Sequence, residues 1–155
     1  MAAKGKKRAR AGDVVMLRAP GGVGYLQYIA RHPVYGDAVL VALGLRETEL
    51  PITGEIFADG YVTFYPLTAA VSQGLVEVVG HLPPPGLPKR FRRAGAISGR
   101  EVKTWIIESE GAELVVKPKL SEEDLRLPIA GIWNHEFLIQ RIAEGWHPTQ
   151  EGRWS

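Results

Sequence analysis

The segment spanning residues 75–93, LVEVVGHLPPPGLPKRFRR, constrains the fold more than any other part of this sequence. It begins as an apolar run typical of a β-strand, which ends at Gly80, and then passes through four prolines within positions 83–88. Each proline restricts φ and removes a backbone donor, so residues 82–88 can form neither a helix nor a central strand. We therefore expect an irregular connector at 82–88 that divides the chain into two halves.

The size and composition of the chain are those of an ordinary globular protein. Its 155 residues are 45% hydrophobic and 23% charged, which suits one domain with a packed core. The 18 glycines and 11 prolines favour short strands joined by frequent turns. We expect a single β-rich domain over residues 12–148, preceded by a basic flexible tail (1–11) and followed by a C-terminal tail (149–155).

The hydrophobic pattern predicts more strands than helices. Alternating or continuous apolar runs predict strands at residues 14–18, 24–30, 38–45, 61–67, 75–80, 102–108 and 113–117. The Pro20-Gly21-Gly22 turn is expected to join the first two strands into a hairpin. The fold class predicted is α+β, with a bent, mainly antiparallel, barrel-like sheet of six to eight strands.

Helix signals are concentrated near the end of the chain. Asn134 as N-cap and Gly145 as terminator predict a helix over residues 135–144, packed on the sheet. Ser121, followed by three acidic residues, predicts a short helix that ends before Pro128. Trp133 and Trp146 flank the longer helix, where aromatic residues usually anchor a core.

No motif in the sequence describes a reaction. The chain has no cysteine, which excludes disulfides and thiolate metal sites, and its four histidines include no pair at helical i, i+4 spacing. No serine-hydrolase elbow or phosphate-binding loop is present. We therefore expect a non-enzymatic protein with no catalytic, cofactor or metal residues. An enzyme would require an exposed pocket in which His81 or His135 lies beside a carboxylate.

The cellular location is predicted from features that the sequence lacks. A chain without cysteine fits a reducing compartment, and no apolar run approaches the length that crosses a bilayer. The basic N-terminus is not followed by the apolar stretch of a secretion signal. A cytoplasmic protein without a membrane partner is expected.

Positive charge is concentrated in two places. Five of the nineteen basic residues lie in the first ten positions, so the rest of the chain, with seventeen acidic residues, carries about −3. These five residues are Lys4, Lys6, Lys7, Arg8 and Arg10. The second cluster surrounds Phe91 and consists of Lys89, Arg90, Arg92 and Arg93. Either cluster is suited to phosphate contact, and Phe91 to base stacking. The competing interpretation is a solvated tail, with Phe91 anchored in the core while its neighbouring cations stay in water.

Negative charge is concentrated between residues 46 and 59, which we expect to form mostly a loop. Its acidic residues are Glu47, Glu49, Glu55 and Asp59. Such a loop suits contact with a basic protein, since complementary charge raises association rate and specificity. The competing interpretation is an ordinary solvated loop.

Several short landmarks occur in order along the chain. They are Gly12-Asp13-Val14-Val15, Gly24-Tyr25-Leu26-Gln27-Tyr28, Val79-Gly80 followed by the prolines and Phe91, then Trp105, and Gln140-Arg141-Ile142. In this order the chain resembles the immunity protein 26 family of bacterial polymorphic-toxin systems, roughly from residue 12 to residue 146. The basic tail, the long proline run and segment 127–140 depart from the family pattern. The resemblance implies a cytoplasmic protein that neutralises a cognate toxin by tight protein–protein binding, without catalytic residues.

A nucleic-acid-binding β-barrel module is the alternative. A Gly-Asp-Val-Val strand followed by a turn and a return strand also opens many small SH3-like barrels, and the two basic clusters would supply phosphate contacts. Binding of that kind should weaken steeply as salt rises and depend on residues 1–10. Neither interpretation specifies an oligomeric state.

Overall fold

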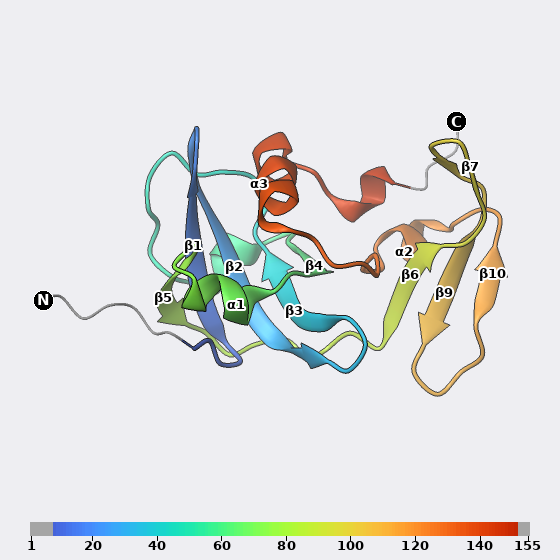
Figure 1. Cartoon of the computed structure of the whole chain (residues 1–155), viewed down its shortest axis with the longest axis horizontal. Coiled ribbons are helices and arrows are strands. Elements are labelled where there is room, and N and C mark those ends of the chain that lie inside the picture. Colours follow the sequence, from blue (N-terminus) through green and yellow to red (C-terminus); the bar gives the residue numbers. More distant parts are fainter. Residues whose placement is uncertain (1–7, 152–155) are drawn as a thin grey trace, which may run out of the picture. The chain divides into compact units, whose positions relative to one another are not determined.

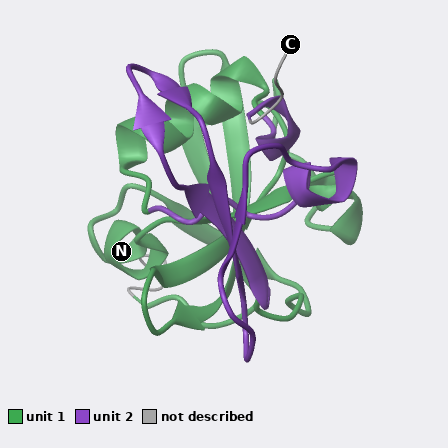
Figure 2. Cartoon of the chain, turned by 90° about the vertical axis from the view of Figure 1, so that its right-hand side faces the viewer, with its two compact units in different colours: residues 1–87, 132–146 green, residues 88–131, 147–155 purple. Residues whose placement is uncertain are grey.

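The computed structural model describes residues 8–151, which divide into two compact units (Figure 2). Unit 1 comprises the chain up to residue 87 together with 132–146, and unit 2 comprises 88–131 and the chain from 147 onward. One boundary between the units falls at the end of the proline segment, and residues 82–88 contain no helix or strand, which confirms the irregular connector. It does not divide the chain into two halves, because residues 132–146 belong to unit 1. That residues 12–148 fold as one domain stays a prediction. Residues 1–7 of the basic tail and 152–155 of the C-terminal tail lie outside the described residues.

Unit 1 is built on a five-stranded antiparallel sheet (Figure 1). Its strands are β1 (Asp13–Ala19), β2 (Gly22–His32), β3 (Gly36–Val41), β4 (Tyr61–Phe64) and β5 (Glu77–His81). Their order in the sheet is β4-β3-β2-β1-β5, and the two outer strands do not pair with each other. The sheet is therefore open rather than barrel-like, which corrects that part of the sequence-based expectation.

The β1–β2 hairpin follows directly from its turn residues. Ala19 pairs with Gly22, leaving Pro20 and Gly21 as the two-residue loop. Proline presets the first corner of the turn, and Gly21 has a φ of 98°, which side chains disfavour. The turn brings the apolar residues of β1 and β2 into register, and residues 13–17 of β1 and 23–27 of β2 are buried. The strands predicted at 14–18 and 24–30 are confirmed.

Helices cover part of this sheet. The longest is α3 (His135–Glu144), and the shorter α1 (Leu67–Ser72) and the 3-10 helix η1 (Gly54–Phe57) also belong to unit 1. The predicted bounds of α3 are confirmed, because Asn134 accepts a hydrogen bond from the Phe137 amide and Gly145 adopts a left-handed C-cap. A Cβ at Gly24 of β2 would lie 3.4 Å from the Ile142 side chain, so α3 packs directly against this strand.

The tryptophans that flank α3 form an aromatic cluster within unit 1. The rings of Trp133 and Trp146 are 5.2 Å apart, and the Tyr61 ring lies 5.2 Å from that of Trp146. The Arg141 guanidinium lies 4.6 Å from the Trp146 ring centroid. Trp146 is buried, which confirms its expected role as a core anchor.

Unit 2 contains a three-stranded and a two-stranded antiparallel sheet. The first consists of β6 (Arg90–Ala94), β9 (Trp105–Ser109) and β10 (Val115–Lys117), in the order β10-β9-β6. The second pairs β7 (Ile97–Ser98) with β8 (Glu101–Val102). Two short helices, α2 (Glu122–Leu125) and η2 (Pro148–Gln150), complete the unit. Its core is formed by Trp105, Ile107, Leu120 and Leu125.

The β-rich α+β class, the antiparallel pairing and the C-terminal helix are confirmed, whereas a single sheet of six to eight strands is wrong. The proline connector removes the amide donors that would carry β5 into β6, so separate sheets form on either side. The strand expected at 38–45 ends at Val41, because the chain turns at Gly44, whose φ is 69°. Residues 90–94 form β6, which the sequence did not predict. Among residues 8–151, every helix is too short or too polar to cross a membrane.

Candidate binding surface

The first half of the acidic segment (residues 46–59) is hydrogen-bonded to β2 of unit 1 at two points. Arg46 and Val23 exchange two backbone hydrogen bonds of 2.8 Å, which continue the sheet for one residue pair. The Leu50 amide donates a 2.8 Å hydrogen bond to the hydroxyl of Tyr25, itself buried in β2. These contacts hold the chain on the core on either side of the exposed residues 47–49.

The second half of the segment is anchored by apolar side chains. Ile56 and Phe57 of η1 are buried in the core of unit 1. Ile52 packs over Gly80 of β5, where an added Cβ would lie 2.9 Å from the isoleucine side chain. The Gly60 amide donates a hydrogen bond to the Phe57 carbonyl and closes the turn. The segment is therefore a structured loop rather than a merely solvated one.

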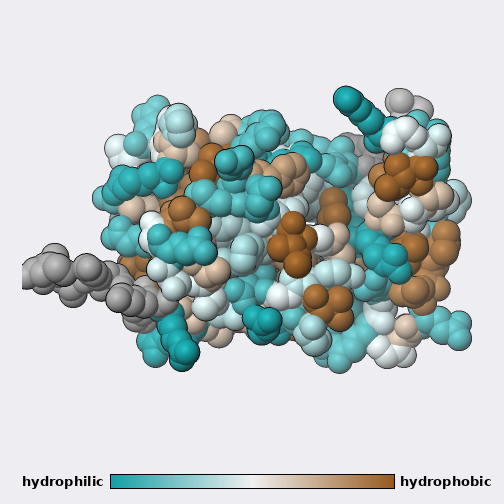
Figure 3. Space-filling view, viewed as in Figure 1, coloured by the Kyte–Doolittle hydropathy of each residue, from teal (hydrophilic) through white to brown (hydrophobic). Residues whose placement is uncertain are grey.

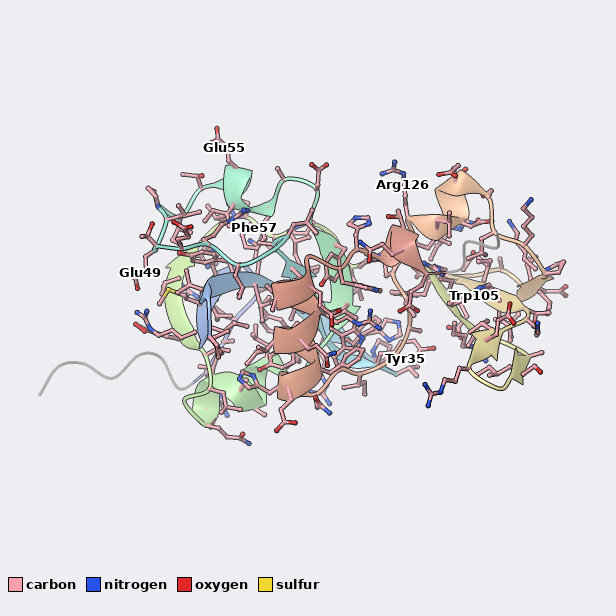
Figure 4. The ribbon with its side chains drawn as sticks, turned by 90° about the horizontal axis from the view of Figure 1, so that it is seen from above. Tyr35, Glu49, Glu55, Phe57, Trp105 and Arg126 are labelled. Carbon is pink, nitrogen blue, oxygen red and sulfur yellow. The ribbon has the colours of Figure 1, made fainter. Side chains whose placement is uncertain are left out.

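The four carboxylates proposed from the sequence are all exposed on this segment: Glu47, Glu49, Glu55 and Asp59. Figure 4 shows Glu55 pointing away from unit 1, whereas Phe57 from the same short helix lies against the strands. Glu49 accepts a 2.8 Å hydrogen bond from Arg18 of β1, an exposed ion pair of the kind that adds little stability. The exposed surface of the acidic segment therefore carries excess negative charge.

A pocket of about 350 Å³ lies within the acidic segment. It is lined by Arg46, Leu50, Pro51, Thr53, Glu55 and Ile56. Its walls are largely apolar, and its two charged lining residues are Arg46 and Glu55. An apolar recess next to an exposed acidic residue is chemically suited to a lysine or arginine side chain, whose stem is apolar and whose head is cationic.

The basic cluster of residues 89–93 is arranged differently from the sequence-based expectation. Arg92 is fully buried in unit 2, where its Nη2 atom donates hydrogen bonds to the carbonyls of Pro148 (2.6 Å) and Leu125 (3.3 Å). Its guanidinium lies 4.4 Å from the centroid of the Trp105 ring. Burial lowers the pKa of Arg92 to about 10. Arg92 therefore cannot contact phosphate from this position, which corrects its place among the candidate nucleic-acid residues.

The neighbours of Arg92 in the cluster differ in burial. Phe91 is buried, which confirms its role as an anchor after the connector. Arg93 donates a hydrogen bond to Glu108 of β9, and Arg90 lies 3.7 Å from Glu123. Lys89 is exposed. Two of the three arginines in the cluster thus contact carboxylates of unit 2, which reduces the positive charge offered to a nucleic acid.

The N-terminal basic residues are described only in part. Arg8 and Arg10 are exposed, and the backbone amide of Arg10 donates a 3.0 Å hydrogen bond to Asp13. Lys4, Lys6 and Lys7 lie outside the described residues.

Of the two histidines named for the enzyme alternative, only His81 lies against a carboxylate. Its Nδ1 atom is 3.1 Å from Oδ1 of Asp13, whose side chain is fully buried, while 46% of the imidazole side chain is exposed. His135 is instead hydrogen-bonded to the Tyr65 hydroxyl at 2.7 Å, and burial lowers its pKa. Among the described residues no group of three or more histidines and carboxylates is placed to hold a metal ion. Sequence reasoning missed the Asp13–His81 pair, because no local pattern links residues 68 positions apart.

A larger pocket of about 650 Å³ lies between α1 and the β2–β3 turn, lined in part by Arg31, Tyr35 and Asp37. Buried Asp37 accepts hydrogen bonds from the Thr68 amide (2.9 Å) and the Tyr28 hydroxyl (3.1 Å). Desolvation and the Asp37 charge raise the pKa of Tyr28. Because both carboxylate oxygens already hold parts of unit 1 together, Asp37 is explained by its structural role.

Comparison with family models, curated proteins and solved structures found no match to this chain. The resemblance to immunity protein 26 therefore enters below only as a proposal.

Proposed function

We propose that this chain is a non-enzymatic, cytoplasmic binding protein that holds a basic protein partner on the acidic segment. The observation that carries the proposal is the combination of four exposed carboxylates with a backbone anchored to the core of unit 1. A loop that is already ordered loses little conformational entropy on binding, so more of its interaction energy contributes to affinity. The pocket beside Glu55 would receive a cationic side chain of the partner.

The finer form of the proposal is that the partner is a cognate bacterial toxin, which this chain neutralises as an immunity protein. The landmarks shared with the immunity protein 26 family support this form. An acidic surface also fits a toxin such as a nuclease, because a basic surface is what an enzyme uses to hold nucleic acid. Neutralisation would then result from covering that surface, with no chemistry on the part of this chain.

The nucleic-acid alternative has less support from the described residues. It depends on the basic tail and on the 89–93 cluster, and within that cluster Arg92 is buried and Arg93 is hydrogen-bonded to Glu108. The cluster then offers Lys89 and Arg90, whose contacts with phosphate would depend strongly on salt.

The proposal can be tested by affinity capture with charge variants. The wild-type chain is immobilised, nuclease-treated bacterial lysate is passed over it, and proteins retained through a high-salt wash are identified. The dissociation constant of the retained protein is then measured for the variant E47K/E55K/D59N, where asparagine tolerates the left-handed φ of Asp59 (59°). The matched control, E77K/E110K/E136Q, makes the same charge change at exposed residues elsewhere.

We expect the acidic-segment variant to bind at least about tenfold more weakly than the control variant. Equal affinities would contradict the proposed surface. If the partner is a toxin, the captured protein must arrest bacterial growth when it is expressed alone, and co-expression of this chain must restore growth. Recovery of nucleic acid alone, and only at low salt without nuclease, would support the alternative instead.

A further inference from the structure

The two edges of the three-stranded sheet in unit 2 differ. Along the β6 edge, the Arg92 amide donates to the Pro128 carbonyl (2.9 Å) and the Ala130 amide donates to the Arg92 carbonyl (2.8 Å). Arg92 and Ile129 thereby form a parallel bridge, and segment 128–130 covers this edge. The β6 edge is closed by the chain itself.

The β10 edge has no such cover among the described residues. β10 pairs with β9 through Val115–Ile107, Val116–Ile106 and Lys117–Trp105, and no further strand pairs with its outer side. The apolar residues at this edge are exposed: Leu114 (55%), Val115 (49%) and Val116 (62%). Figure 1 shows β10 as the outer strand of its sheet, and hydrophobic side chains gather over this edge in Figure 3. An exposed apolar edge strand is a template for pairing with another chain.

The sequence of this edge is self-complementary. Residues 113–117 read Glu-Leu-Val-Val-Lys, with an acid at one end, a base at the other and apolar residues between. Residues 115–117 of this stretch form β10, and residues 113–114 lead into it. In an antiparallel pair of identical strands centred on Val115, Glu113 lies opposite Lys117 of the other copy, and Leu114 lies opposite its Val116. A parallel, in-register pair would instead place like charges side by side at both ends, which is unfavourable.

We propose that a second copy of this chain pairs with residues 113–117, antiparallel and centred on Val115, and that residues 113–114 extend β10 when the pair forms. Two β10 strands then join two three-stranded sheets into one six-stranded sheet across a two-fold axis. Lys117 already donates to Asp124 at 2.6 Å, and its ammonium retains donors for Glu113 of the other copy. Pro118, directly after β10, lacks an amide donor and confines the pairing to this short segment. This inference concerns unit 2 and is independent of the acidic segment.

A cysteine cross-link tests the register, because the natural chain has no cysteine. The two-fold axis places Val115 opposite its own copy, at a Cα separation of about 4.5–5.5 Å that a disulfide can span. The variant Val115→Cys should therefore form a covalent dimer under mild oxidation. In the control Val116→Cys, the two Cα atoms are offset along the strands by two residues and lie roughly 8 Å apart, beyond disulfide reach.

Sedimentation of the cysteine-free wild-type chain tests the assembly itself. We expect a reversible monomer–dimer equilibrium, which the exposed substitution Glu113→Lys weakens by about tenfold because both end pairs become repulsive. Glu113→Gln should have a smaller effect. A wild-type chain that remains monomeric at high micromolar concentration would overturn the proposal. Equal cross-linking of the two cysteine variants, or a dimer unaffected by Glu113→Lys, would overturn the proposed pairing.

Discussion

The imidazole of His81 lies 3.1 Å from the carboxylate of Asp13, and this contact joins the end of β5 to the start of β1. The other carboxylate oxygen accepts the Arg10 amide at 3.0 Å, so a fully buried acid organises both strand ends. Next to it, the Gln27 side chain donates to the carbonyl of Leu82 at 2.8 Å. Together these contacts hold the beginning of the proline connector on unit 1.

Replacing Asp13 tests this role. Asp13→Asn converts one accepting oxygen to a donor that faces the Arg10 amide or the His81 imidazole, inside the protein. We expect the free energy of unfolding to fall by about 1–3 kcal/mol, as measured by urea denaturation. His81→Gln should cost less, because the imidazole is nearly half exposed. A stability of Asp13→Asn equal to that of the wild type would contradict the role assigned to this carboxylate.

Two glycines allow backbone strain to be separated from close packing. Gly12 and Gly36 both have positive φ, 94° and 82°, so alanine at either position costs roughly 1–2 kcal/mol for conformation alone. A Cβ on Gly12 would also lie 2.6 Å from the Leu82 carbonyl oxygen, whereas nothing lies within 4 Å of one on Gly36. Gly12→Ala should therefore lower the free energy of unfolding by at least about 1 kcal/mol more than Gly36→Ala. Thermal and urea denaturation would measure the difference, and equal losses would refute it.

Arg92 offers a test of how unit 2 is held together. In Arg92→Ala the carbonyls of Leu125 and Pro148 lose a buried donor, and a cavity opens against Trp105. The expected loss of stability is about 3–5 kcal/mol, observable by denaturation followed through tryptophan fluorescence. Arg92→Lys should recover only part of it, because an ammonium lacks the planar guanidinium that lies over the Trp105 ring. Full recovery with lysine would show that charge alone matters.

His135 makes stability depend on pH in the weakly acidic range. Burial lowers its pKa from the ordinary 6.5, with partial opposition from Glu136, so the unfolded chain binds a proton at a higher pH than the folded chain. The stabilisation due to neutral His135 is complete above pH 6.5 and is lost as the pH falls toward its folded pKa. We expect His135→Gln to show a shallower loss of stability than the wild type between pH 7 and 5.5 in urea titrations. Parallel slopes would count against this linkage.

The elements predicted correctly from the sequence are those whose signals are local. The β1–β2 hairpin depends on Pro20 and Gly21, and α3 depends on its caps Asn134 and Gly145. In both cases the relevant hydrogen bonds and φ values lie within a few residues of each other. The exposure of the four carboxylates on the acidic segment also agrees with their polar surroundings in the sequence.

For the basic cluster of residues 89–93, local sequence patterns do not predict the structure. The sequence indicates either a phosphate-binding cluster or solvated cations at residues 89–93, yet residues 90–93 lie in β6 and Arg92 is buried. Its acceptors, the carbonyls of Leu125 and Pro148, are 33 and 56 positions away in the chain. No pattern near Arg92 indicates them.

The turns, the caps, the connector at 82–88, the antiparallel β-rich class and the charge of each segment can be predicted from the sequence alone. Tertiary packing is needed to show that Asp13 meets His81 and that Arg92 is internal. It is also needed to show that the strands of residues 8–151 form three separate sheets, and that in this part of the chain the β6 edge is covered while the β10 edge is not. The difference arises from the range of the interactions. Backbone conformation and capping act between neighbours in the chain, whereas burial, pairing of strand edges and the solvation of a charge depend on which distant segments meet.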